Sequence, residues 1–158
     1  MDMFVDMNMP QLNLPNAALK TKLVEGTTQV FDAVRKKYLV LTPEEWVRQH
    51  FIHYLNKEKN YPLGLMGVEQ MVKYNGMQTR ADIVLYNADG KPNVIVECKA
   101  PKVKITQDAF NQIAKYNFKL KVNFLVVTNG IQHFCCAMDY KNNKITFLEG
   151  VPAYSNLV

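Results

Sequence analysis

The chain has 158 residues, of which 48% are hydrophobic and 11% aromatic, and it carries a formal net charge of +5. This length and composition indicate a single folded domain and exclude a disordered or low-complexity protein. The three cysteines are an odd number without Cys-x-x-Cys spacing, which argues against a disulfide framework and favours a reducing cytoplasm. No signal-peptide pattern and no stretch of membrane-spanning length is visible, so we expect a cytoplasmic protein without a membrane partner.

The start of the chain differs in pattern from the rest. Residues 1–19 are rich in Met, Asn and Pro and lack periodicity, which predicts an irregular lead-in. Residues 20–41 contain short apolar runs and a Glu25-Gly26 turn signal, which predicts a small antiparallel β annex. We therefore expect three parts: the lead-in and annex over 1–41, a core domain over 42–150 and a tail over 151–158.

A helix start follows the annex. Thr42 suits the N-cap, Pro43 suits the first helical position, and Glu45 stands three residues after Thr42, as in a capping box. Helical spacing of apolar residues continues to about residue 59. Residues 67–74 are then predicted as a strand that leads into the next segment.

A β-hairpin is predicted from two runs of β-branched or aromatic residues, 83–86 and 94–96, around an Asp89-Gly90 pair. If Asp89-Gly90 is a two-residue turn, Asp82 lies directly opposite Glu97, about 5.5 Å away at Cα. The two carboxylates then share one face of the sheet.

The same register fixes two further positions. Lys99 points to the face of Glu97, because side chains alternate along a strand. Pro92 lies opposite Asn87 at a site that needs no N–H. Both faces of the hairpin are otherwise apolar, so we expect its strands to be central in their sheet.

Charged groups at one end of such strands are costly unless they are paired, and opposed carboxylates repel each other. A divalent cation would remove this repulsion. Asp82, Glu97 and the backbone carbonyl of Cys98 supply the few oxygen ligands that suit Mg²⁺, with Mn²⁺ able to substitute. Lys99 would then lie beside the attacking water and the charged transition state.

The remaining elements complete an α/β pattern. Residues 106–120 are predicted as a second helix, 122–127 as a buried strand, and 133–138 and 144–148 as outer strands. The order of helix, three strands, helix and further strands predicts a sandwich in which helices flank a central mixed β-sheet.

The positive charge is concentrated between Lys99 and Lys121. This segment holds six lysines against one acid, Asp108, an excess equal to the net charge of the whole chain. A basic segment that begins at the carboxylates suits a phosphate backbone, and Lys102 is a candidate phosphate contact. A solvated lysine face is the alternative for such a run taken alone.

Other polar residues offer fewer signals. Glu45 and Glu69 could each approach the cation, although capping explains Glu45 and nothing in the spacing settles Glu69. His50 and His53 are three apart on the first helix without Cys or acidic partners nearby, which favours packing or surface roles over zinc binding. His133, in a predicted strand, is assigned a structural role.

These motifs resemble the PD-(D/E)XK nuclease superfamily, and in particular the N-terminal nuclease domain of type I restriction enzyme R subunits. The motif stands here as Ala81-Asp82, with Ala in place of Pro, followed by Glu97-Cys98-Lys99. Gln112 and Tyr116, four apart on one helix face, fit the Gln-x-x-x-Tyr motif that accompanies this core. The resemblance extends over about residues 41–130.

The resemblance implies a restriction-endonuclease-like fold and a Mg²⁺-dependent endodeoxyribonuclease. Asp82 and Glu97 would bind the metal, Lys99 would assist the water, and Gln112 with Tyr116 would position DNA. Since no Gly-x-x-x-x-Gly-Lys loop occurs, we expect these residues to lack the ATP-driven motor of R subunits, so that a separate motor or specificity subunit is an expected partner. Homodimerisation stays open.

Two other functions are compatible with the same residues. One is a non-catalytic DNA-binding or subunit-docking module that uses the basic face alone, for which DNA binding would depend on salt but not on metal. The other is a nuclease directed at RNA, which a comparison of DNA and RNA substrates would reveal.

Overall fold

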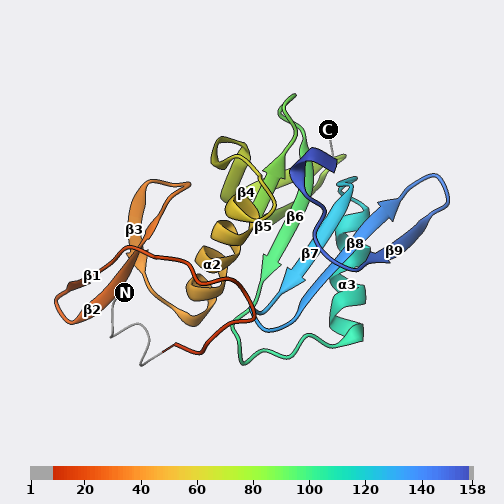
Figure 1. The fold of residues 1–158 in the computed structure, drawn as a ribbon. Coiled ribbons are helices and arrows are strands. Elements are labelled where there is room, and N and C mark those ends of the chain that lie inside the picture. The colour runs from red at the N-terminus through yellow and green to blue at the C-terminus, as the bar shows by residue number, and fades with distance from the viewer. Residues whose placement is uncertain (1–8, 157–158) are drawn as a thin grey trace.

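The computed structural model describes residues 9–156 and contains two separate β-sheets and two α-helices (Figure 1). Predictions for residues 1–8 and 157–158 lie outside this described part. Within residues 9–156, no helix has both the length and the apolar character needed to cross a membrane. The elements in chain order are β1 (Thr21–Val24), β2 (Thr27–Asp32), β3 (Lys37–Val40), α2 (Pro43–Lys57), β4 (Met66–Tyr74), β5 (Met77–Tyr86), β6 (Pro92–Cys98), α3 (Gln107–Phe118), β7 (Phe124–Thr128), β8 (His133–Asp139) and β9 (Lys144–Leu148), with short 3₁₀ turns at Leu63–Leu65 and Tyr154–Asn156.

The larger sheet has six strands in the order β4-β5-β6-β7-β8-β9. The β6–β7 pair is parallel and every other neighbouring pair is antiparallel. Helix α3 makes the crossover between the two parallel strands, as parallel pairing requires. The expected mixed α/β domain is therefore confirmed, and each strand and helix expected after residue 41 is present.

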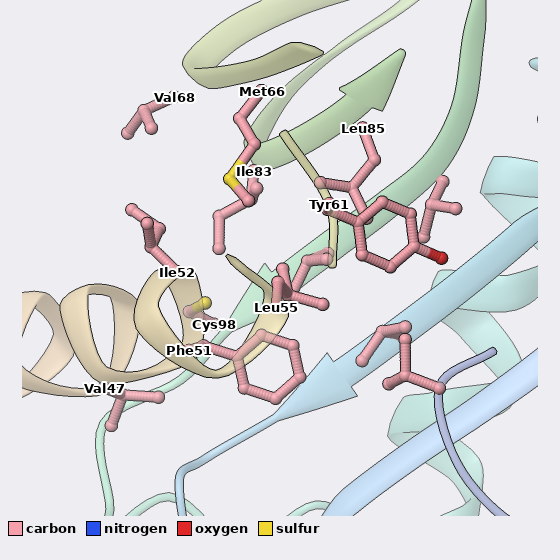
Figure 2. Packing of buried hydrophobic residues seen from close by; sticks show 14 of the residues in the cluster. Val47, Phe51, Ile52, Leu55, Tyr61, Met66, Val68, Ile83, Leu85 and Cys98 are labelled. Atoms are coloured by element: carbon pink, nitrogen blue, oxygen red, sulfur yellow. The ribbon is translucent and has the colours of Figure 1, made fainter. Parts of the chain in front are cut away.

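Helix α2 covers one face of the large sheet. Val47, Phe51 and Leu55 recur at helical spacing and are fully buried. They pack against Ile83 and Leu85 of β5, in a cluster that also contains residues of β4, β6 and β7 (Figure 2). This cluster fixes the position of α2 over the strands that carry Asp82 and Glu97.

Helix α3 covers the opposite face of the same sheet. Phe110 and Ala114 of α3 belong to a second buried cluster with Val84, Ile95 and Leu125. Since Val84 and Ile95 alternate with the residues that face α2, the hairpin strands are buried on both sides. Their central position, expected from the apolar pattern, is confirmed by the strand order.

The start of α2 agrees only in part with a capping box. The Thr42 hydroxyl accepts a hydrogen bond from the Glu45 N–H at 3.0 Å, as an N-cap residue should. The prediction that the Glu45 carboxylate closes the box is wrong, because that carboxylate accepts hydrogen bonds from Arg48 and Gln49. The Glu45 side chain is thus buried and bound to other residues of α2.

The β5–β6 turn also differs from the prediction. Gly90 N–H donates to the Asn87 carbonyl and Asn87 N–H to the Lys91 carbonyl, so three residues form the loop, with Gly90 at φ +85°. Pro92 consequently lies opposite Tyr86, not Asn87. One extra residue, Asn93, bulges before the next pair and restores the expected register.

The smaller sheet is an antiparallel meander of β1, β2 and β3. It corresponds to the annex expected over 20–41, and it lies beside α2 in Figure 1. The described part of the lead-in is tied to the core, because the Trp46 indole donates to the Pro10 carbonyl and Asn13 N–H donates to the Gly130 carbonyl. The division of the chain into three domains stays a prediction.

Candidate functional site

Asp82 lies at the end of the β5–β6 ladder. The last paired residues are Ile83 and Val96, so continuing this register places Asp82 opposite Glu97. One Asp82 carboxylate oxygen accepts a hydrogen bond from the Cys98 N–H at 2.7 Å, and the other from Arg48 Nη1 at 3.2 Å. The Asp82 side chain is 18% exposed, which leaves it accessible to a small ligand.

Glu97 lies close to Asp82 at the end of β6. Burial, together with the negative charge of Asp82 and a hydrogen bond between the two side chains, raises the pKa of Glu97 to about 7. Burial is also the main reason that the pKa of Asp82 is raised. Burial and mutual repulsion thus disfavour the state in which both carboxylates are charged, as expected for like charges in a desolvated site.

Lys99 follows Glu97 at the end of the strand. Its backbone N–H donates to the Thr128 carbonyl of β7 at 2.8 Å, which anchors the residue to the parallel neighbour. Its positive charge opposes the rise in the pKa of both Glu97 and Asp82. The structure therefore brings together the three residues that the sequence singled out for chemistry.

Arg48 is the main feature of the site that the sequence interpretation missed. It projects from α2, its side chain is 6% exposed, and it makes two hydrogen bonds to the Glu45 carboxylate at 2.9 and 2.7 Å. The same guanidinium contacts Glu69 at 3.3 Å and Asp82 at 3.2 Å. Burial alone would lower the pKa of Arg48, but the bonds and charge of Glu45 and the charge of Asp82 raise it, so the guanidinium stays charged.

A second arginine extends this network toward the annex. Arg35 contacts Asp32 at 2.9 Å, Glu69 at 3.2 Å and Glu45 at 3.5 Å. Asp32 is fully buried and also accepts a hydrogen bond from Gln49 at 3.0 Å. Burial would raise the pKa of Asp32, but these bonds outweigh it and lower the pKa. The annex is thereby connected to α2 by an ion pair, Arg35 with Glu45, and by the hydrogen bond from Gln49 to Asp32.

The two arginines bind the two acids, Glu45 and Glu69, whose approach to the cation the sequence left undecided. Glu45 and Glu69 are both paired with Arg35 and Arg48, so their charge is already compensated. Glu44, the first-turn neighbour of Glu45, is exposed and close to the carboxylate pair. The partial burial of the Glu44 carboxylate and the negative charge of Asp82 raise the pKa of Glu44.

A cleft of about 550 Å³ opens beside these residues, between the annex, the start of α2 and the loop after β6. Its lining residues come from four parts of the chain: Arg35, Leu39, Val40, Thr42, Pro43, Glu44, Glu45, Arg48, Glu69 and Ala100. Glu44 and Arg48, which interact electrostatically with Asp82, belong to this lining. The carboxylate pair is therefore next to a space that a ligand can enter.

The predicted DNA-positioning residues lie on exposed surfaces. Gln112 and Tyr116 are both exposed on α3, and the Tyr116 hydroxyl donates a hydrogen bond to the Gln78 carbonyl of β5. Lys102 is exposed in the turn that follows β6. Their roles toward DNA stay predictions.

The histidines are engaged in local contacts. His50 Nδ1 lies 2.9 Å from the Trp46 carbonyl, and its ring packs on the Trp46 indole at 4.1 Å. Burial lowers the pKa of both His50 and His53. His133 lies between the Thr128 hydroxyl and the Asn13 carbonyl, at 2.7 and 2.8 Å.

The chemistry of the carboxylate pair fits Mg²⁺. Glu97 and Asp82 are neighbouring carboxylates that together form an oxygen donor set. Burial and the charge of Asp82 raise the pKa of Glu97 to about 7, and a divalent cation would stabilise the charged form of the pair. In residues 9–156, no three His, Cys, Asp or Glu side chains gather as a ready-made metal cluster. The predicted ligand set of Asp82, Glu97 and the Cys98 carbonyl contains two such side chains, so it requires solvent or phosphate oxygens to complete it.

The fold and site define a mixed α/β domain with two carboxylates and a lysine at the point where the pairing of the central strands β5 and β6 ends. Residues 43–152 match the family model described as type I restriction enzyme R protein N terminus, and the chain belongs to this family. Residues 43–152 include all the residues proposed above for metal and substrate.

A solved structure supports the same fold. The chain is similar to a fragment of a putative HsdR subunit of a type I restriction enzyme from Vibrio vulnificus YJ016, with a TM-score of 0.50 and 22% identity. The similarity covers 74% of this chain and 25% of that chain, so the matched region spans about a quarter of the solved Vibrio fragment. A comparison with curated protein sequences finds no match.

Proposed function

We propose that this domain is a metal-dependent endodeoxyribonuclease of the PD-(D/E)XK type, acting as the nuclease part of a type I restriction system. The observation that supports the proposal most strongly is the contact between the half-buried carboxylates of Asp82 and Glu97, with Lys99 beside them. Membership in the R-protein N-terminal family supports the choice of DNA as substrate.

In this proposal, Asp82 and Glu97 bind Mg²⁺ together with the Cys98 carbonyl. The bound cation would supply an activated water and neutralise charge on the scissile phosphate. The Cys98 N–H and Arg48 hold the Asp82 carboxylate in a fixed orientation. Lys99 donates from Nζ to the attacking water or to a phosphate oxygen, where negative charge grows in the transition state.

Plasmid cleavage tests the proposal. Supercoiled DNA is incubated with the protein and Mg²⁺ or Mn²⁺, and the nicked and linear products are quantified. We expect Glu97→Gln and Lys99→Gln each to reduce the rate at least about 100-fold, as expected for removal of a charge-stabilising group. Glu149→Gln and Lys91→Gln make the same changes at exposed positions and should leave the rate unchanged.

Cleavage that persists in Glu97→Gln at the wild-type rate would overturn the assignment. Cleavage that persists in EDTA would also overturn it, because the proposed chemistry requires a cation. A parallel assay with RNA of the same sequence separates a DNA nuclease from an RNA nuclease.

A second candidate is a non-catalytic DNA-binding or docking module, and one observation favours it. Arg48 already neutralises part of the charge of Asp82, which reduces the need for a cation. Calorimetry with Mn²⁺ separates the two candidates: binding that is lost in Glu97→Gln supports the nuclease, whereas DNA binding that is indifferent to metal in a protein that binds no Mn²⁺ supports the module.

The proposed partners are DNA and a DNA-translocating or specificity component. The chain corresponds to a quarter of the Vibrio HsdR fragment, so in this proposal those activities reside in another domain or subunit. Pull-down with such subunits, followed by cleavage assays with and without ATP, tests this partnership.

A further inference from the structure

The six lysines between Lys99 and Lys121 do not form one continuous patch at the carboxylates. Helix α3 connects the end of β6 to the start of β7, so it runs antiparallel to both strands. Its first turn lies toward the end of the sheet where β6 finishes, and its last turn lies toward the end where β7 begins (Figure 1). Glu97 is near the C-terminus of β6, so the first turn is the one nearer to it. The lysines therefore divide into a group near the site and a group far from it.

The distant group forms part of a groove. Lys115 of α3 and Lys119, which caps the C-terminus of that helix, line a space of about 390 Å³ together with Asn143 and Lys144 of the β8–β9 hairpin. We call this space the α3–β9 groove, and its complete lining is Lys115, Phe118, Lys119, Asn143, Lys144 and Ile145. Two separate elements thus bring three lysines to one groove, and none of the residues within 9–156 that line it is acidic.

The charges of these lysines are available. Lys115, Lys119 and Lys144 are exposed, and none of them forms an ion pair within 4.0 Å with another residue in the range 9–156. Asp139 is paired with Lys144 across the hairpin and interacts with its charge without a close ion pair, and Asn142 donates two hydrogen bonds to the Asp139 carboxylate. Between residues 115 and 144 the sequence has five lysines and only this one acid.

The helix alone does not account for this arrangement. Lysines in the last turn of a helix are favourable because of the helix dipole, which explains Lys115 on α3. It does not explain Lys144, which comes from a separate hairpin. Lys121 adds a further positive charge at the same end, with Nζ 4.3 Å from the ring centre of Tyr140.

We propose that the α3–β9 groove is a second DNA-binding site, which holds the phosphate backbone at a distance from the cleavage centre. The groove offers point charges and an amide without a fixed base-reading geometry, which suits phosphate contacts that carry no sequence information. The choice of DNA as the polyanion rests on the proposed function, whereas the groove itself needs neither metal nor carboxylates.

The length of α3 sets how many base pairs of DNA separate the groove from the cleavage site. At 1.5 Å per residue, Lys119 lies about 18 Å along the helix axis from the first residue, Gln107. Duplex DNA rises 3.4 Å per base pair, so about five base pairs span this distance. The groove would therefore contact duplex DNA several base pairs away from the phosphate being cleaved.

Fluorescence anisotropy with a labelled duplex of about 24 base pairs in EDTA tests the groove, since this length exceeds the span of about five base pairs. The test variant is Lys115→Gln/Lys119→Gln/Lys144→Gln. We expect its Kd to rise at least about tenfold at low salt. The slope of log Kd against log salt should fall by about two to three, since each phosphate contact contributes about 0.9.

Two matched variants control for charge and folding. Lys37→Gln/Lys57→Gln/Lys91→Gln removes the same charge at exposed positions outside the groove and should keep at least most of the wild-type slope. The groove variant with Arg in place of the three lysines should bind DNA as the wild type does. Equal losses in the groove and control triples would overturn the proposal, because they would show binding by overall charge.

Failure of the groove proposal and failure of the proposed nuclease function give different results in these assays. If plasmid cleavage is absent but the groove variant alone loses DNA binding, the groove is supported and the nuclease assignment fails. If the wild type cleaves DNA and the groove variant binds and cleaves normally, the groove assignment fails. Displacement of the duplex by polyglutamate as efficiently as by unlabelled DNA would also overturn the assignment to nucleic acid.

Discussion

The guanidinium of Arg48 lies 3.2 Å from the carboxylate of Asp82, and it is the only charged side chain from a helix that contacts this acid directly among residues 9–156. It links the carboxylate pair to Glu45 and Glu69, two acids that the proposed metal chemistry does not use. The candidate site is therefore one end of a larger ionic network that also joins the annex to the core through Arg35.

Replacing Arg48 with Met should strongly destabilise the protein. The substitution leaves Glu45 buried without its main partner, and removing one member of a buried ion pair costs about 3–5 kcal/mol. The measurement is urea unfolding followed by circular dichroism. Arg80→Met is the matched control. Arg80 is 67% exposed and, among the described residues, forms one ion pair, with Glu69 at 3.3 Å, so its loss should cost under about 1 kcal/mol. Similar losses in both variants would contradict the central role of Arg48.

Glu97→Gln should stabilise the metal-free protein at alkaline pH. Because the folded state raises the pKa of Glu97 from 4.5 to about 7, its contribution to stability is full below pH 4.5 and is lost as the pH rises to about 7. In EDTA at pH 8 the variant should gain up to about 3 kcal/mol, and at pH 4 it should gain nothing. Unfolding at both pH values measures this, with exposed Glu149→Gln as the control. An equal gain at both pH values would show that ionisation of Glu97 is not the cause.

Asp32→Asn should have the opposite pH dependence. The pKa of Asp32 is lowered in the folded state, so its stabilising contribution is present above pH 3.8 and is lost as the pH falls through the folded pKa. We expect a loss of about 3 kcal/mol at pH 7, where a buried charge pair with Arg35 is broken, and a smaller difference near pH 2. The exposed Asp89→Asn should show little change at either pH. A constant difference for Asp32→Asn across this range would exclude a charge effect.

Gln112→Ala should reduce DNA cleavage without affecting stability. Gln112 is exposed on α3, so its removal leaves no cavity, and we expect a cleavage rate at least about tenfold lower because a substrate contact is lost. Gln107→Ala removes another exposed glutamine of the same helix and should cleave as the wild type. If both variants retain the wild-type rate, Gln112 does not position the substrate.

The sequence predicted the carboxylate pair well, although its assumed turn was wrong. Alternation and β propensity determine which residues face each other once the register is set, and these are local properties. The loop has three residues instead of two, and the bulge at Asn93 compensates. Asn93 is paired with Asn123 through a 2.7 Å side-chain hydrogen bond. Such a contact spans 30 positions and leaves no local pattern to detect.

The ionic network could not be predicted for a similar reason. Arg35, Arg48 and Glu69 come from the annex, α2 and β4, and only the folded arrangement brings them together. Glu45 turns inward to Arg48, whereas its neighbour Glu44 is exposed and interacts with the charge of Asp82. This difference depends on how α2 is rotated on the sheet, which its buried residues determine. Capping rules identify the first turn but not which of its carboxylates faces Asp82.

The proposed nuclease depends on Asp82 and Glu97 binding one divalent cation together. Crystals soaked in Mn²⁺, with diffraction collected at the Mn absorption edge, reveal whether they do. We predict an anomalous peak between the two carboxylates, within about 2.0–2.3 Å of an oxygen from each. The absence of a peak at this position, with Asp82 still held only by Arg48 and the Cys98 N–H, would contradict the proposed metal site.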